Sequence, residues 1–164
     1  MPNNWRLAIA PRHVERADEV MRLVTECGFK AARFSQLKDS VLSLNTVVVV
    51  DTIGYLRYLY AKASLVFVGK SLCVGGGHNI IEPAFYAKPI IVGPMMQNFR
   101  DITALFKAQG AIVQAKDIQD FNLQIEHLIK EENLRTKLGH KAYAVVQANQ
   151  GAGKRTLQMI EKFV

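Results

Sequence analysis

The chain alternates short β-rich runs with helical patterns along most of its length, and this alternation constrains its fold more than any other feature. Alternating strands and helices are typical of a parallel sheet that carries helices on its faces. The sequence predicts six strands, at Leu7–Ala10, Ala31–Phe34, Val47–Val50, Leu65–Val68, Pro89–Val92 and Ala111–Gln114. We therefore expect an α/β fold, a doubly wound parallel sheet in one domain over residues 1–164.

Apolar side chains at three- and four-residue spacing predict the helices between these strands. The predicted helices are Val14–Cys27, Tyr55–Ala63, Ile80–Tyr86, one from Phe99 that ends at Gly110, Ile118–Val146 with an interruption around Gly139, and a last one from about Thr156. Gly28 supplies a stop for the first helix, and Asp51 or Thr52 is placed to cap the second.

The composition favours one globular domain with an anionic partner and argues against a membrane protein, a disulfide framework or a metal site. The 164 residues are 49% hydrophobic, which suits one globular domain with a sizeable core. The formal charge of +7 favours an anionic partner. No run of 18 or more apolar residues and no signal-peptide pattern occurs, so we expect this fragment to be soluble and cytosolic. Cys27 and Cys73 lack metal-ligand spacing, and two buried thiols are expected rather than a disulfide or a metal site.

A glycine-rich segment follows the fourth predicted strand. Gly75, Gly76 and Gly77 precede His78 and Asn79 and then the third predicted helix. Glycines let a backbone approach a ligand and turn its N–H groups toward it, and a helix start favours a phosphate. Glu82 lies in the first helical turn, where a carboxylate can accept hydrogen bonds from a ribose diol. The pattern predicts a nucleotide-sugar site, although tight packing alone also explains a bare run of glycines.

Other polar loops follow predicted strands as well. They comprise Pro11–His13, Asp51–Thr52, Ser71–Asn79 and Gly93–Arg100. Because ligands of such sheets bind outside the carboxyl ends of the strands, these loops are expected to share one rim.

Seven motifs together resemble the C-terminal half of 3-deoxy-D-manno-octulosonic acid (Kdo) transferases. They are Ala10-Pro11-Arg12-His13-x-Glu15-Arg16, Asp51-Thr52-x-Gly54, Phe67-Val68-Gly69-x-Ser71-Leu72, Gly76-Gly77-His78-Asn79-x-x-Glu82-Pro83, Lys88-Pro89, Gly93-Pro94 with Asn98-Phe99-Arg100-Asp101, and Asn149-Gln150-Gly151-Ala152. They occur in order across nearly the whole chain. The resemblance implies one Rossmann-like half of a GT-B fold, from a Gram-negative-type bacterium.

Enzymes of this family are inverting glycosyltransferases that transfer Kdo from CMP-Kdo to a lipid A precursor in lipopolysaccharide biosynthesis. The resemblance implies that Arg12 contacts the donor nucleotide, that Gly76, Gly77, His78 and Asn79 hold its phosphate, and that Glu82 binds the ribose. Ser71 and Arg100 are further donor-binding candidates, although Arg100 could instead pair with Asp101. Neither a metal nor a cofactor is expected beyond the CMP-Kdo substrate.

The family's N-terminal domain carries the general base, the acceptor surface and the membrane attachment, and it is absent from these residues. We therefore expect no catalytic residue in this fragment and no turnover by it alone. The lipid A precursor and the cytoplasmic face of the inner membrane are expected partners of the full-length enzyme only.

Two rival functions come from other classes. Another GT-B-like enzyme, such as a UDP-sugar glycosyltransferase or a sugar epimerase, would share the glycine loop and the ribose carboxylate. A basic module that binds nucleic acid would explain the charge of +7, but its lysines and arginines are spread over the predicted helices rather than forming a stripe with aromatic residues. No nucleic-acid partner is therefore expected.

Overall fold

The computed structural model describes residues 5–37, 42–43, 45–73, 75–151 and 160–161. Two compact units, Met1–Arg57 and Tyr58–Val164, each hold one three-stranded parallel sheet. The six predicted strands are confirmed, most of them shorter than expected, as β1 Ala8–Ile9, β2 Lys30–Arg33, β3 Thr46–Val49, β4 Val66–Phe67, β5 Ile90–Val92 and β6 Val113–Gln114. The α/β class with parallel pairing is therefore confirmed, whereas the six strands form two three-stranded sheets and not the one sheet expected.

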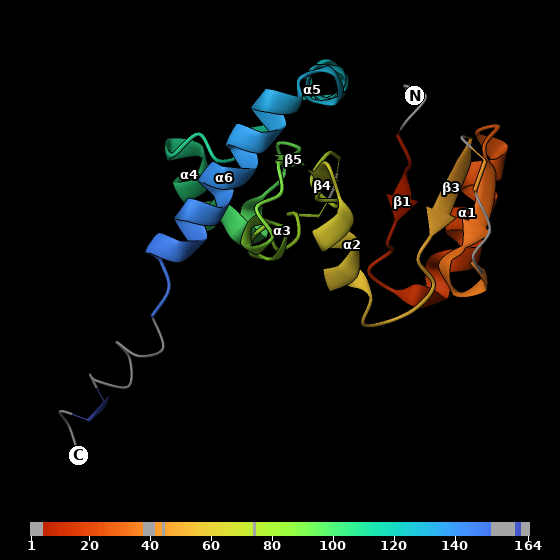
Figure 1. Ribbon diagram of the computed structural model, residues 1–164, viewed down its shortest axis with the longest axis horizontal. Helices are drawn as coiled ribbons and strands as arrows, with labels where there is room; N and C mark the ends of the chain where they lie inside the picture. Colours follow the sequence, from red (N-terminus) through yellow and green to blue (C-terminus); the bar gives the residue numbers. More distant parts are fainter. Residues whose placement is uncertain (1–4, 38–41, 44, 74, 152–159, 162–164) are drawn as a thin grey trace. The chain divides into compact units, whose positions relative to one another are not determined.

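The sheet of the first unit has the order β1-β3-β2, so the most apolar strand is central. All four residues of β3 are buried, which is typical of a parallel sheet whose two faces are both covered. Val48 pairs with Ala8 on one side and with Ala32 on the other. The 3₁₀ helix η1 (Val14–Arg16) leads into α1 (Ala17–Glu26), which packs against β2 and β3 (Figure 1). A second 3₁₀ helix, η2 (Phe34–Gln36), follows β2 directly.

The second unit has the strand order β4-β5-β6 and most of the helices. Its elements are α2 (Leu56–Lys62, which begins at the end of the first unit), α3 (Ile81–Phe85), η3 (Gln97–Phe99), α4 (Arg100–Ala108), α5 (Ile118–Lys130) and α6 (Glu132–Ala148). Helix α6 packs against α3, α4 and α5 and also contacts β5 (Figure 1). The long helix α6 therefore ties the other helices of this unit to its sheet.

Strand β5 is buried on both of its faces. Ile90 and Val92 belong to one apolar cluster, which includes Phe106 of α4. The intervening Ile91 points to the opposite face, where it packs with Leu128 of α5 and Leu138 of α6. Helices therefore cover both faces of this sheet, which is the doubly wound arrangement predicted from the alternation of strands and helices.

The predicted interruption around Gly139 is wrong. Helix α6 runs through Gly139, and the chain breaks instead at Glu131, between α5 and α6. Gly139 is buried where α6 crosses the turn between α3 and β5, and a Cβ atom there would overlap the carbonyl oxygen of Ala87. This glycine permits close helix packing and does not end the helix. The predicted stops at Gly28 and Gly110 are confirmed, since both take positive φ directly after a helix.

The expectation of two buried thiols is wrong as well, because Cys27 and Cys73 are both exposed and both are free. Cys27 lies at the end of α1, beyond the turn that buries Val24, and Cys73 lies in the glycine-rich loop. The helix predicted from Thr156 starts outside the described residues. Among the helices that are described, none combines the length and apolar character needed to span a membrane.

Candidate functional site

The glycine-rich loop connects β4 to α3 at the carboxyl end of the central sheet of the second unit. Gly76 and Gly77 have φ angles of 79° and 78°, which side chains other than glycine rarely adopt. Cβ atoms at these two positions would overlap the side chains of Asn98 and Met96. The loop thus lies against the segment that follows β5, and packing alone already requires these two glycines.

Backbone hydrogen bonds join the two loops into one structure. The amide of Asn98 donates to the carbonyl oxygen of Gly76 at 3.1 Å, and the amide of Met95 donates to that of Ser71 at 2.8 Å. The side-chain amide of Asn98 adds a contact to the Gly75 oxygen at 3.4 Å. The position of the glycine loop is therefore set by the loop after β5.

Some backbone amides of the glycine-rich loop donate hydrogen bonds within the protein, and others are left to contact a ligand. Gly77 donates its N–H to the carbonyl oxygen of Lys70 at 2.7 Å, so this amide is already bonded within the protein, and a contact of Gly77 with the phosphate stays a prediction. The N–H of Gly76 has no acceptor within the described part of the chain. Asn79 accepts a hydrogen bond from the amide of Ile81 at 2.9 Å, so its side-chain oxygen forms an Asx turn at the start of α3. His78 and Asn79 are both half-buried.

Ser71 is fully buried. Its hydroxyl donates to the carbonyl oxygen of Val68 at 2.6 Å and accepts from the amide of Gly93 at 2.9 Å. Both hydrogen bonds stay within the protein and connect the ends of β4 and β5. The geometry gives Ser71 a role in positioning the two loops, and a direct contact with a donor stays a prediction that this burial does not favour.

Glu82 is exposed in the first turn of α3, where a carboxylate suits the positive end of the helix. Two effects raise the pKa of Tyr60 in α2 to about 12. Burial of the phenol is the larger, and the negative charge of Glu82 is the smaller. The ring of Tyr60 lies 6.3 Å from that of Tyr86, one helical turn after Glu82. Tyr60 therefore packs beside the face of α3 that carries Glu82, and the exposed carboxylate is accessible to a diol.

Arg12 belongs to the first unit. It is exposed in the segment between β1 and η1, at the carboxyl edge of that sheet. The glycine-rich loop belongs to the second unit, and the expected contact of Arg12 with the nucleotide stays a prediction.

The role expected for Asp51, a cap for the following helix, is wrong. Its carboxylate accepts hydrogen bonds from the hydroxyl of Ser35 at 2.6 Å and from the Ser35 amide at 2.9 Å. Arg33 lies 3.4 Å away as an ion-pair partner and also pairs with Asp18. The hydrogen bonds from the side chain and then the backbone of Ser35 hold the pKa of Asp51 below its ordinary value. Asp51 therefore fixes η2 against the end of β3.

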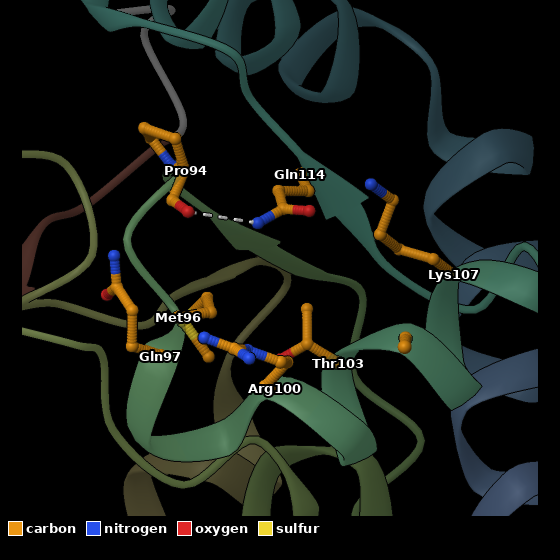
Figure 2. A pocket seen from close by; sticks show the side chains of 8 residues that line it. Pro94, Met96, Gln97, Arg100, Thr103, Lys107 and Gln114 are labelled. Carbon is orange, nitrogen blue, oxygen red and sulfur yellow. Dashed lines mark hydrogen bonds between the residues drawn. The ribbon is translucent and has the colours of Figure 1, made fainter.

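Arg100 lines a pocket of about 230 Å³ between the start of α4 and the ends of β5 and β6 (Figure 2). The alternative of an ion pair with Asp101 is not supported, since the ion pairs of the described residues do not include one between them. The pocket is lined by Pro94, Met96, Gln97, Arg100, Thr103, Ala104, Lys107 and Gln114. Sequence reasoning missed Thr103, Lys107 and Gln114. The spacing of residues 100, 103, 104 and 107, which places them on one helical face, was the available signal.

Comparison with known proteins gives a family match over most of the chain. The sequence profile of the family Glycosyl transferases group 1 matches residues 9–145. Apart from Ala8 of β1, this range includes every strand of both sheets, and it includes every candidate site residue described above.

Individual relatives agree with this match. A bifunctional glycosyltransferase/methyltransferase of Fusobacterium nucleatum is 33% identical over 79% of the chain, which spans 20% of that relative. A 3-deoxy-D-manno-octulosonic acid transferase of Haemophilus influenzae is 31% identical over 98% of the chain, and one of Bordetella pertussis is 33% identical over 96%. The chain spans 38% and 37% of these two relatives, so it corresponds to less than half of their length.

A solved structure is also similar. It is the C-terminal CMP-Kdo binding domain of WaaA from Acinetobacter baumannii, which has 33% sequence identity and a TM-score of 0.78. The similarity covers 87% of this chain and 74% of that domain. The fold class and the resemblance derived from the motifs are thereby confirmed.

Proposed function

Because this chain belongs to the family Glycosyl transferases group 1, we propose that it forms the donor-binding domain of a Kdo transferase, which transfers Kdo from CMP-Kdo to a lipid A precursor. The observation that carries this proposal is the similarity, in both sequence and fold, to a solved CMP-Kdo binding domain. In this proposal, the acceptor surface and the general base belong to the N-terminal domain that the family resemblance implies. In the full-length enzyme, the site would work at the cytoplasmic face of the inner membrane.

The described geometry supports a division of roles within the second unit. The N–H of Gly76, which no described residue accepts, and the side chains of His78 and Asn79 form the part of the loop that would meet the phosphate of CMP. Glu82, exposed beside them in α3, would accept hydrogen bonds from the ribose diol. Gly77 and Ser71 would act indirectly, since their hydrogen bonds hold the loop itself.

Fixed donors at the phosphate also suit the chemistry of glycosyl transfer. When an acceptor hydroxyl attacks the anomeric carbon, CMP departs and negative charge builds up on its phosphate. Hydrogen-bond donors already held where this charge develops stabilise the transition state, and one such donor contributes about 3 kcal/mol. Arg12 and Arg100 are proposed as additional cations near the donor.

A titration of the ¹⁵N-labelled chain with CMP, and separately with UMP, tests this function. CMP is expected to shift the amide signals of Gly76, His78, Asn79 and Glu82 more strongly than UMP does. Equal responses to both nucleotides would indicate a different GT-B enzyme, and no response to either would contradict a donor site in this chain.

Glu82→Gln tests the ribose assignment within the same experiment. Loss of the carboxylate charge should weaken CMP binding about tenfold, because each hydrogen bond to a charged acceptor contributes roughly 1.5–3 kcal/mol. Glu132→Gln is the matched control, since Glu132 is likewise exposed in the first turn of a helix. Unchanged affinity of the Glu82 variant would remove Glu82 from the site.

A further inference from the structure

The pocket between α4 and the carboxyl ends of β5 and β6 carries two cations and no acidic side chain (Figure 2). We propose that it is a second binding site, distinct from the glycine loop, for one oxyanion: a carboxylate or a phosphate group. The proposal rests on this pocket and does not depend on which nucleotide the glycine loop holds.

The charges come from Arg100 and Lys107, two turns apart on the same face of α4. The ion pairs among the described residues include neither of them, so both cations remain available to a ligand. Charge-assisted hydrogen bonds from such groups to an oxyanion are about twice as strong as neutral ones. Within the pocket, the balance of charge therefore favours an anion.

Thr103 supplies a hydroxyl between the two cations. Its residue is only 4% exposed, and its Oγ1 atom has no hydrogen-bond partner among the described residues. Buried polar atoms normally have a partner, and one without a partner costs about 1–3 kcal/mol. Threonine adopts two χ1 rotamers in helices, so a rotation about χ1 can move this hydroxyl to a second staggered position, where it can donate to a ligand.

The walls of the pocket are held by the protein. The Gln114 side-chain amide donates to the carbonyl oxygens of Gly93 at 3.3 Å and Pro94 at 3.4 Å, which fixes the end of β6 against the loop after β5. The volume of about 230 Å³ lies below the roughly 300–1,000 Å³ of sites for drug-sized ligands. The pocket therefore suits a single acidic group with its neighbouring atoms, and not a whole nucleotide sugar.

One loop separates this pocket from the glycine loop. Met96 lines the pocket, and its side chain also occupies the space that a Cβ atom at Gly77 would need. The two sites thus share Met96 as a common wall. A ligand with one acidic group on each side of this wall, or two ligands bound together, could occupy both.

Two probes distinguish the sources of the oxyanion. The ¹⁵N-labelled chain is titrated with inorganic phosphate and, in a separate sample at equal ionic strength, with free Kdo, a sugar acid that carries a carboxylate and no phosphate. Saturable shifts are expected at Thr103, Ala104, Lys107 and Gln114. If only Kdo saturates these shifts, the pocket binds a carboxylate. If only inorganic phosphate saturates them, the pocket binds a phosphate group. If both probes do, the pocket accepts either oxyanion.

Single substitutions test whether the residues of the pocket cause the shifts produced by phosphate and Kdo. Lys107→Gln is expected to weaken binding about fivefold or more, and Thr103→Val should weaken it without loss of charge. Lys137→Gln is the control, because Lys137 is exposed on α6 and does not line the pocket. The Lys137 variant should bind each probe as tightly as the original chain does. Shifts that never saturate, or an equal loss in the Lys137 variant, would overturn the proposal. Because neither probe contains cytidine, saturation here together with no response to CMP would contradict the proposed donor function alone.

Discussion

Replacement of Gly139 by alanine is expected to destabilise the second unit, although helix propensity alone predicts the opposite. Gly139 lies inside α6, where alanine is favoured over glycine by about 1 kcal/mol. The new Cβ atom would overlap the carbonyl oxygen of Ala87 and lie 2.9 Å from its carbonyl carbon. Both contacts are with backbone, which cannot rotate away as the end of a side chain can.

The magnitude follows from these opposing effects. Overpacking of a well-packed site costs typically about 1–3 kcal/mol, and a cost at or above the top of this range is expected here because Ala87 already has a φ of 53°. After subtraction of the helix gain, the free energy of unfolding should fall by about 2 kcal/mol. For a chain of this size, such a loss lowers Tm by about 4–8 °C.

Thermal unfolding followed by circular dichroism at 222 nm measures this change, because most helical residues belong to the second unit. Thr136→Ala is the matched control: Thr136 is exposed on α6, so alanine there should stabilise by a few tenths of a kcal/mol. An increase in Tm for the Gly139 variant equal to that of the control would show that α6 does not approach the Ala87 turn as closely as described.

Two further predictions concern the loops. Ser71→Ala leaves the amide of Gly93 without its buried acceptor. The free energy of unfolding, measured by urea denaturation, should fall by about 1–3 kcal/mol. A loss below about 0.5 kcal/mol would contradict the role of Ser71 in positioning the loops. Because the folded-state pKa of Asp51 is depressed, its contribution to stability should be complete above the ordinary aspartate pKa of about 4 and be lost as the pH falls further. Trp5 fluorescence in urea from about pH 6 to about pH 3 measures this, and Asp51→Asn should show a smaller loss; an unchanged pH dependence would contradict it.

Strand and helix positions followed from local patterns. The β-branched run Val47–Val50 predicted a strand, and the structure shows that all four residues of β3 are buried. Helix ends at Gly28 and Gly110 were predictable because positive φ is a local property of glycine. Gly139 was misjudged, since a glycine required for close packing has the same sequence signal as one that ends a helix.

The candidate site was only partly predictable. Glu82 was identified from its place in a first helical turn, and the structure leaves it exposed there. Ser71 and Asp51 were assigned other roles, because their partners Gly93 and Ser35 lie 22 and 16 residues away in the sequence. A hydrogen bond across such a separation depends on how the strands are arranged, and local pattern does not contain that arrangement.

By itself, the sequence determined the parallel α/β class, the order of its elements, the glycine-rich loop and the family resemblance, all of which are encoded in short motifs and their spacing. Only the tertiary structure decided that the glycines pack against Met96 and Asn98, that the Gly77 amide is already bonded, and that Arg100 shares a pocket with Lys107 and Gln114. The physical reason is that burial and hydrogen-bond partners depend on contacts between distant segments, which form only when the strands and helices have packed together.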